Sequence, residues 1–176
     1  MSRLESGLER LRLWDHALCI RFNWAVRIAP VCRVFRCISR LGDGVFWYSL
    51  MLALLAIDGT RAFEPVARMA ATGLVCTLVY KWLKSKTSRP RPFAVENAVR
   101  AGADPLDQFS FPSGHTLHAV GFSVVSVAFY PMLGWLLVPF TVLVAVSRVV
   151  LGLHYPSDVL AGAALGALIS AASLNF

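Results

Sequence analysis

Five stretches of apolar residues follow one another along the chain, separated by polar or charged residues. The first, residues 44–57, is bounded by Asp43 and Asp58, and the second, residues 65–83, carries charge only near its ends. A helix needs about 17 to 25 mostly apolar residues to cross a bilayer, and flanking residues can extend a short run. The pattern predicts an all-α integral membrane bundle of five transmembrane helices, the last three over residues 114–130, 133–151 and 156–174.

Residues 13–40 show a different pattern, because large aromatic and aliphatic residues are interspersed with five arginines. A span exposed to lipid does not tolerate five arginines, whereas a helix lying in the membrane interface suits both kinds of residue. We expect an amphipathic interfacial helix here, broken near Pro30. Residues 1–43 then form a basic N-terminal segment and residues 44–176 the transmembrane core. If residues 18–38 span the membrane instead, the number of spans becomes six.

The composition supports a membrane protein, since 57% of the 176 residues are hydrophobic and the mean hydropathy is +0.62. Eight arginines lie in the first 40 residues and contribute to a net charge of +7. In such a chain they favour anionic lipid head groups, so no nucleic-acid partner is expected. Residues 1–16 carry charge throughout, so no cleavable signal peptide is expected. The four cysteines lack metal spacing and are interpreted as small apolar fillers.

The stretch between the second and third spans, residues 84–112, is rich in proline and charge and has no helical apolar stripe. It is predicted to be a long loop over the membrane surface that carries the active site. The last span is rich in small residues, and Gly162 with Gly166 forms a small-xxx-small pair. Such a pair permits close packing of two helices.

Three clusters of polar residues lie at the ends of the predicted spans. Because successive spans alternate in direction, all of these ends fall on one side of the membrane. Arg148 and Asp158 are the only formal charges after Phe109. A charge in a bilayer costs at least about 2.5 to 3.5 kcal/mol, so these two need a polar site. In chain order the clusters are Lys84 with Arg91, then residues 112–115, then Arg148 with His154 and Asp158.

This set of residues suits phosphoryl transfer, in which negative charge on three oxygens is held while one group attacks and another leaves. The planar, permanently charged fork of arginine binds two such oxygens at once. Ser113 and Gly114 stand where the third span begins, so free backbone N–H groups and the helix dipole add affinity for an anion. Glycine also allows the oxygen a close approach.

The two histidines suit a covalent mechanism. Pro156 is well placed as the first residue of a helix, which puts Asp158 in the first turn, within reach of one imidazole nitrogen of His154. The other nitrogen is then free to attack phosphorus and form a phosphohistidine. His115, at another helix end, can protonate the leaving oxygen and later take a proton from water.

Each residue alone has a simpler explanation, such as an interfacial anchor or, for Asp158, a helix cap. The joint pattern outweighs these explanations. His118 is expected to hydrogen-bond within the bundle rather than to orient His115. Asp104 and Asp107 have no third ligand at metal spacing, so no metal site is expected. The remaining charges are interpreted as loop or head-group contacts (Lys86, Arg89 and Arg100) and span boundaries (Asp43 and Asp58).

At these positions the sequence resembles the type 2 phosphatidic acid phosphatase superfamily, which also contains the vanadium haloperoxidases. The family pattern is Lys, six residues, Arg-Pro; then Pro-Ser-Gly-His; then Ser-Arg, five residues, His, three residues, Asp. Every position is met between residues 84 and 158. The resemblance implies His154 as nucleophile, Asp158 as its orienting partner and His115 as general acid. It also implies phosphate binding without metal or other cofactor by Lys84, Arg91, Ser113, Gly114 and Arg148.

Membrane members of the family usually have six spans, with an amphipathic helix between the first two. Here residues 13–40 look like that helix, and the preceding span is missing. The resemblance implies a bacterial inner-membrane enzyme with a periplasmic site. With five spans, however, the arginine-rich N-terminus shares the face of the site, and positive residues normally mark the cytoplasmic side.

The resemblance implies that the substrate is a lipid of the bilayer: phosphatidic acid, phosphatidylglycerophosphate, undecaprenyl diphosphate or lipid A. Two other functions stay open, a vanadium-dependent haloperoxidase and a non-catalytic protein that binds or transports lipid phosphates. The apolar spans argue against the first, because haloperoxidases are generally soluble. The complete set of catalytic positions argues against the second.

Overall fold

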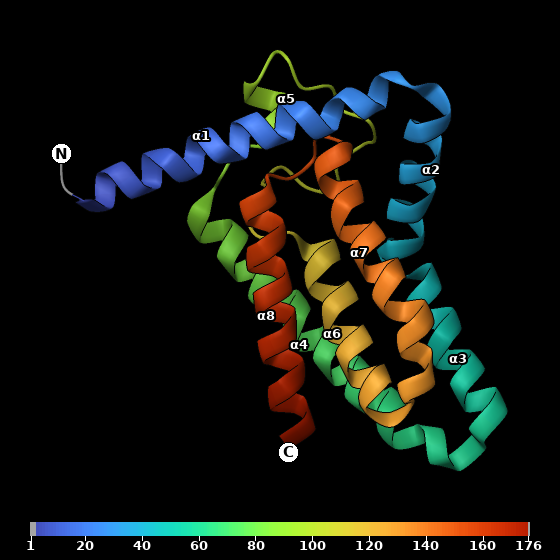
Figure 1. Cartoon of the computed structure of the whole chain (residues 1–176). Coiled ribbons are helices and arrows are strands. Elements are labelled where there is room, and N and C mark those ends of the chain that lie inside the picture. Colours follow the sequence, from blue (N-terminus) through green and yellow to red (C-terminus); the bar gives the residue numbers. More distant parts are fainter. Residues whose placement is uncertain (1–2, 176) are drawn as a thin grey trace.

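The computed structural model describes residues 3–175, which form helices joined by turns and one long loop (Figure 1). Helix α1 (Arg3–Asn23) lies across one end of the bundle, and a 3₁₀ turn, η1 (Trp24–Arg27), leads into α2 (Ala29–Arg40). Ile28 between them is extended, with φ −93° and ψ 102°, and Pro30 stands in the first turn of α2. Proline is favoured at that position and cannot continue a helix from α1. The break predicted near Pro30 is confirmed.

Helix α2 runs along α7 and continues through a π-helical turn, η2 (Leu41–Val45), into α3 (Phe46–Asp58). The 13 residues of α3 span only about 20 Å at 1.5 Å per residue, against an apolar bilayer core of about 30 Å. Helix α2 precedes it directly, buries one face in the bundle and keeps its arginines on the other. Residues 13–40 thus lie on two helices on either side of the predicted break, and the second of them, α2, packs along α7 in the bundle.

After α3 the chain reverses and runs back along the bundle, and each later helix reverses direction again (Figure 1). The helices begin and end close to the predicted apolar runs, so the all-helical fold class is confirmed for residues 3–175. The elements that follow α3 are, in chain order, η3 (Gly59–Ala62), α4 (Phe63–Thr87), α5 (Pro92–Val95), α6 (Gly114–Phe129), η4 (Pro131–Leu133), α7 (Gly134–Val150) and α8 (Pro156–Asn175).

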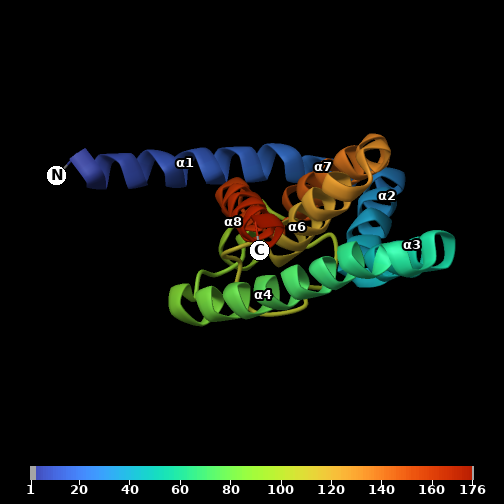
Figure 2. The ribbon, with the colours of Figure 1, turned by 90° about the horizontal axis from the view of Figure 1, so that it is seen from below.

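Helix α6 lies at the centre of the bundle and packs against α4, α7 and α8 (Figure 2). Its contact with α8 depends on two glycines. A Cβ on Gly166 would lie 2.4 Å from the carbonyl oxygen of Leu117, and one on Gly162 would lie 2.6 Å from that of Ser113. No side chain fits at such distances, so the predicted close packing of Gly162 and Gly166 is confirmed.

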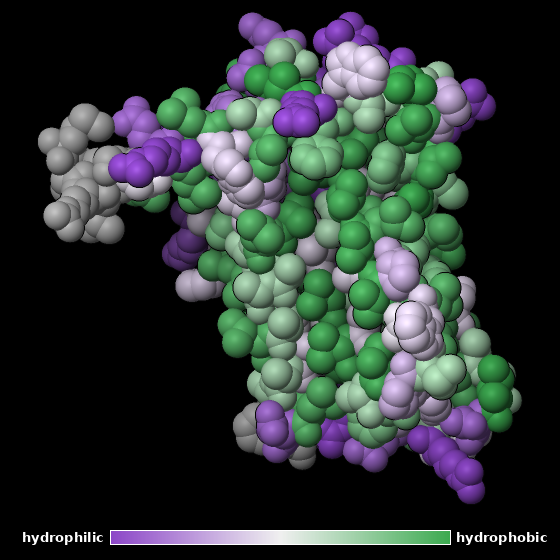
Figure 3. Space-filling view, viewed as in Figure 1, coloured by the Kyte–Doolittle hydropathy of each residue, from purple (hydrophilic) through white to green (hydrophobic). Residues whose placement is uncertain are grey.

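The outside of the bundle is apolar. On the face shown in Figure 3, hydrophobic residues cover the middle of the bundle, and hydrophilic residues gather at its two ends. Large apolar side chains such as Leu52, Leu78 and Leu168 are more than 60% exposed. Three stretches among the described residues are long and apolar enough to cross a membrane, and α6 is a shorter apolar helix. The stretches are Ala29–Thr87, which contains the reversal at η3, Pro131–Val150 and Pro156–Asn175. The chain is a membrane protein.

The loop between α4 and α6 is fixed to both α1 and the end of α7. Buried Asn23, the last residue of α1, donates to the carbonyl oxygens of Arg100 and Val150, both at 2.9 Å, and accepts from the Arg100 N–H at 2.7 Å. Gly152, in the turn after α7, has φ +70°, and a Cβ there would lie 2.7 Å from Val99. Only glycine lets the loop pack so closely on this turn.

Three of the four cysteines are buried, as expected for apolar fillers, namely Cys19, Cys32 and Cys76. Cys37 is exposed, because it lies on the outer face of α2. The interpretation as a filler is wrong for Cys37.

Candidate active site

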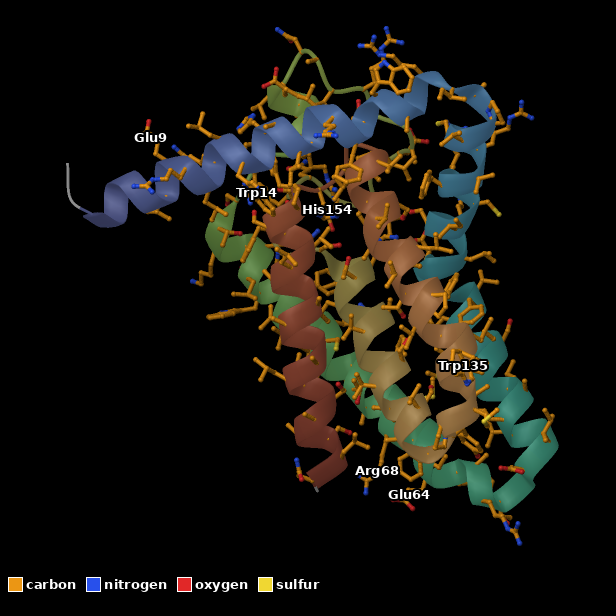
Figure 4. All side chains as sticks on the ribbon, viewed as in Figure 1. Glu9, Trp14, Glu64, Arg68, Trp135 and His154 are labelled. Atoms are coloured by element: carbon orange, nitrogen blue, oxygen red, sulfur yellow. The ribbon has the colours of Figure 1, made fainter. Side chains whose placement is uncertain are left out.

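The predicted site residues meet at the end of the bundle that α1 crosses. Figure 4 shows His154 beneath α1, between the end of α7 and the start of α8, whereas Glu64 and Arg68 lie at the opposite end. The ends of α4 and α7 and the beginnings of α6 and α8 all reach this region, as the alternation of spans predicted. The loop formed by residues 88–113 lies above this region in Figure 1.

His154 is 1% exposed and has a defined tautomer. Its Nδ1 lies 2.6 Å from the carbonyl oxygen of Ser110. A carbonyl oxygen only accepts hydrogen bonds, so Nδ1 carries the proton and Nε2 of the neutral ring keeps its lone pair. Nε2 accepts a hydrogen bond of 3.3 Å from Nη1 of Arg91, and both residues line one cavity. The unprotonated nitrogen therefore lies beside a cation.

Asp158 is fully buried but does not make the hydrogen bond to His154 that the sequence suggested. The closest approach, from Oδ2 to Nδ1 of His154, is 3.8 Å. The carboxylate accepts instead from the backbone N–H of Tyr155 at 2.8 Å and from Nη1 of Arg89 at 2.6 Å. Asp158 shapes the turn that carries His154, and Ser110 supplies the direct hydrogen bond.

The electrostatic surroundings keep the His154 ring neutral. Burial comes first, followed by the positive charges of Arg148, Arg91 and Lys84, and together they lower the pKa of His154 well below its ordinary value. Protonation would place another positive charge beside three cations at a buried position. At neutral pH the ring is thus uncharged.

Two of the predicted phosphate ligands are paired with Asp107. Lys84 donates to both of its carboxylate oxygens at 2.7 Å, and Nη2 of Arg91 donates to Oδ1 at 2.7 Å. Arg91 also donates to the carbonyl oxygens of Asp107 at 2.9 Å and Leu153 at 2.7 Å. Burial alone would raise the pKa of Asp107, but Lys84 and Arg91 outweigh it and lower that pKa below its usual value. Lys84 and Arg91 are thus both paired with the carboxylate of Asp107.

Arg148 comes from the last turn of α7 and is 3% exposed. Its Nη1 is hydrogen-bonded to the hydroxyl of Ser39 on α2. Its Nε is buried without a hydrogen-bond partner among the described residues, although Arg148 lines the cavity. An unsatisfied guanidinium N–H is costly, so this donor is suited to a bound anion.

Ser113 and Gly114 differ in their relation to the cavity. Ser113 is the N-cap of α6, and its hydroxyl accepts from the backbone N–H of Thr116 at 3.5 Å and bonds the Thr116 hydroxyl at 2.9 Å. It does not line the cavity, so its side chain serves the helix start. Gly114 does line the cavity, at the N-terminal end of α6 where backbone N–H groups are free.

The histidines of α6 have separate environments. Nε2 of His115 contacts the carboxylate of Asp43 in the π-helical turn η2, and both residues line the cavity. His118 lies 2.8 Å from the carbonyl oxygen of Gly114 through Nδ1 and 3.1 Å from the Thr77 hydroxyl through Nε2. The expectation that His118 hydrogen-bonds within the bundle is confirmed.

Sequence reasoning missed several charged residues that support the site. Arg89, interpreted as a loop charge, bridges Asp158 and the buried Asp15 of α1, at 2.6 and 2.8 Å. Asp15 also accepts from the backbone N–H of Ser157 at 2.9 Å. Asp43, interpreted as a span boundary, contacts His115. The one visible signal was that Asp43 stands between two glycines, Gly42 and Gly44.

A cavity of about 780 Å³ connects these groups to the apolar interior. His154, Arg91 and the other charged groups line one part of it. The rest is lined by apolar and aromatic residues of α3 and α4, including Tyr48 and Leu74, which are 65% and 62% exposed on the outside of the bundle. The cavity therefore has a polar end near His154 and an apolar end that lies between α3 and α4.

Comparison with known proteins identifies the family. The model of the PAP2 superfamily matches residues 64–176, which include every position of the three-part pattern. The chain belongs to the PAP2 superfamily. The crystal structure of LpxE from Aquifex aeolicus superimposes with a TM-score of 0.77 at 27% identity, over 96% of this chain and 94% of that one.

Among curated PAP2 relatives, undecaprenyl-diphosphatase BcrC of Bacillus subtilis is 31% identical over 127 residues, which are 72% of this chain and 63% of that protein. Lipid A 1-phosphatase of Rhizobium johnstonii is 38% identical over 162 residues, which are 81% of this chain and 66% of that protein. The chain thus spans about two thirds of the length of these relatives.

Proposed function

We propose that this protein is a metal-independent lipid phosphatase that acts through a phosphohistidine on His154. The observation that carries the proposal is the hydrogen bond of 2.6 Å from Nδ1 of His154 to the carbonyl oxygen of Ser110. It leaves Nε2 without a proton, with its lone pair accepting a hydrogen bond of 3.3 Å from Nη1 of Arg91, in a cavity that reaches membrane helices. A neutral imidazole held in this way is an activated nucleophile in a cationic site.

The phosphate binds among Lys84, Arg91, Arg148 and the N-terminal end of α6 near Gly114. The permanently charged forks of the two arginines stabilise the equatorial oxygens as charge develops on them. The unsatisfied Nε of Arg148 gains a partner when phosphate enters. Asp107 releases Lys84 and Arg91 to the substrate, because two anions do not share these donors without repulsion.

The reaction has two steps, each with one histidine acting on phosphorus and the other on a proton. Nε2 of His154 forms a bond to phosphorus as the bond to the leaving oxygen breaks, and His115 gives that oxygen a proton. Water then attacks the phosphohistidine, His115 takes the proton from water, and the bond to Nε2 breaks to release phosphate. Asp158 and Ser110 hold the turn and the ring of His154 throughout.

The substrate is a lipid monophosphate or an isoprenoid diphosphate. The apolar part of the cavity is lined by Tyr48, Leu74 and their neighbours on α3 and α4, where a hydrocarbon tail remains in the bilayer. The names of the relatives agree with such substrates, since they act on undecaprenyl diphosphate and lipid A. A haloperoxidase acts on halide in water and has no use for this apolar wall.

We propose five passes through a bacterial inner membrane, with α1 in the interface at the periplasmic face. Exposed apolar side chains of α1, including Trp14 and Leu13, suit the head-group region. The side of the membrane is tested by labelling single cysteines in intact cells. Ala101→Cys on the loop reacts with a membrane-impermeant maleimide, and Arg61→Cys at the opposite end does not. The reverse result places the site in the cytoplasm.

The proposed function is tested by phosphate release in detergent from a panel of four lipids with EDTA present. Phosphatidic acid, phosphatidylglycerophosphate, undecaprenyl diphosphate and lipid A cover the expected classes. At least one is hydrolysed, His154→Ala abolishes the release, and mass spectrometry after a rapid quench finds a phosphate on His154. Absence of release from all four lipids, or release by His154→Ala at the parental rate, contradicts the proposal.

A further inference from the structure

The π-helical turn between α2 and α3 depends on two glycines, and it orients Asp43 toward the site. Gly44 has φ +128°, a conformation that side chains rarely adopt, and a Cβ there would lie 2.8 Å from the Tyr48 ring. Gly42 packs on Val144 of α7, whose methyl groups would be 3.1 Å from an added Cβ. Single π-helical turns inside α-helices occur frequently at functional sites. Here the turn sets the carboxylate of Asp43 toward α6.

Asp43 is the carboxylate that contacts the second histidine of the site. Its Oδ1 meets Nε2 of His115, with side-chain exposures of 27% for Asp43 and 10% for His115. Both line the cavity that holds His154 and Arg148. By contrast, the carboxylate of Asp158 stays 3.8 Å from His154. The histidine that is directly paired with a carboxylate is thus the proposed acid, not the nucleophile.

The chemistry explains why this pairing is useful. A general acid must carry a proton when the leaving group departs, yet cations such as Arg148 and Arg91 oppose a positive imidazole in the same cavity. A carboxylate in contact with one ring nitrogen stabilises the imidazolium and fixes the direction of the other nitrogen. Without Asp43, Nε2 of His115 would lose its carboxylate partner.

We infer that Asp43 is the positioning residue of the general acid, an inference that rests on the proposed phosphatase function. Nε2–H of His115 donates to Asp43, and the proton on Nδ1 moves to the leaving oxygen as its bond to phosphorus breaks. The electron pair of that bond stays on the oxygen, and His115 becomes neutral while its hydrogen bond to Asp43 remains. In the second step Nδ1 takes the proton of the attacking water.

The experiment compares two substrates that differ in their need for a proton. The leaving alkoxide of phosphatidic acid needs protonation, whereas the leaving phenolate of p-nitrophenyl phosphate is stable without it. Asp43→Asn is expected to lower kcat/KM on phosphatidic acid by about 100-fold, at the low end of the effect of a general acid. On p-nitrophenyl phosphate the loss in kcat/KM is a few-fold, because kcat/KM reports the steps up to departure of the leaving group and excludes the attack of water that both substrates share. The ratio of the two rates in one preparation is independent of how much protein is folded.

Three further variants complete the test. His115→Ala shows the same dependence on the leaving group, and Asp43→Asn added to His115→Ala causes no further loss, because both act on one proton. Asp58→Asn, at the other end of α3, keeps the parental ratio. Equal losses on both substrates, or full activity of Asp43→Asn on phosphatidic acid, overturn the role of Asp43. Neither result touches the proposed function, which depends on release by the parent and its loss in His154→Ala.

Discussion

Nζ of Lys84 donates hydrogen bonds to both carboxylate oxygens of Asp107, each at 2.7 Å. Asp107 takes a second cation, Arg91, at the same distance. A carboxylate so placed occupies donors that a phosphate would use. If phosphate binds there as proposed, this carboxylate is expected to lower the affinity for phosphate and to favour release of the product.

Asp107→Asn is therefore expected to strengthen inhibition by inorganic phosphate several-fold, because one negative charge is removed from between two cations. Titration of the hydrolysis rate with phosphate measures the change, and Asp104→Asn on the same loop is the matched control. Because the pKa of Asp107 is lowered, the carboxylate stays charged from neutral pH into mild acid, and the difference between parent and variant persists there. Unchanged or weaker inhibition would show that Asp107 only orients Lys84 and Arg91.

The lowered pKa of His154 predicts how hydrolysis depends on pH. A histidine nucleophile is active when neutral, and a lowered pKa keeps it neutral to more acidic pH. The rate constant kcat/KM on p-nitrophenyl phosphate, corrected for ionisation of the substrate, is therefore expected to stay level well below the ordinary titration range of histidine. It falls only as the pH drops through the lowered pKa. A decline centred near pH ~6.5, the value of a free histidine, would contradict the neutral buried ring.

Gly166→Ala is expected to destabilise the bundle by about 1 to 3 kcal/mol, because the added Cβ overlaps the carbonyl oxygen of Leu117 at 2.4 Å. Thermal unfolding in detergent measures the effect as a lower midpoint. Gly134→Ala provides the control, since its Cβ would meet Val127 at an ordinary 3.7 Å. Equal midpoints for the two variants would mean that α6 and α8 separate at little cost.

Arg89→Ala is expected to reduce both stability and activity. It leaves the carboxylates of Asp15 and Asp158, which are 1% and 0% exposed, without their shared cation. Breaking a buried pair in this way costs about 3 to 5 kcal/mol. Unfolding in detergent and phosphate release measure the two effects, and Arg100→Ala on the same loop is the control. A stable Arg89→Ala protein with full activity would show that α1 is not held to Asp158 through this charge.

The helices of the bundle could be predicted because membrane crossing is a local property of the sequence. A run such as residues 156–174 must be apolar over a bilayer's thickness, and α8 occupies almost the same residues. The convergence of His115, Arg148 and His154 followed from the alternation of spans. Residues 29–40 could not be assigned to the bundle in this way. Their arginines make the segment look polar, and its buried face is recognised only from the packing against α7.

The finer geometry of the site depends on contacts between distant residues, and single-sequence reasoning does not reach these. Asp43 meets His115 only because a turn with Gly44 at positive φ bends the helix at that point. Ser110 replaces Asp158 as the hydrogen-bond partner of His154 because the loop brings its carbonyl oxygen within 2.6 Å of Nδ1. The role of Ser113 as a helix cap was likewise hidden by its place in a family pattern.

The cavity that runs from His154 to the outer surfaces of α3 and α4 would let the two products of the proposed reaction leave by different routes. A dephosphorylated lipid would lose the charged group that held it at the polar end and would return sideways into hydrocarbon past Tyr48 and Leu74. Phosphate is too polar for that route and would leave toward water. Each product would thus vacate the site without blocking the other, and a fresh lipid would enter without ever leaving the membrane.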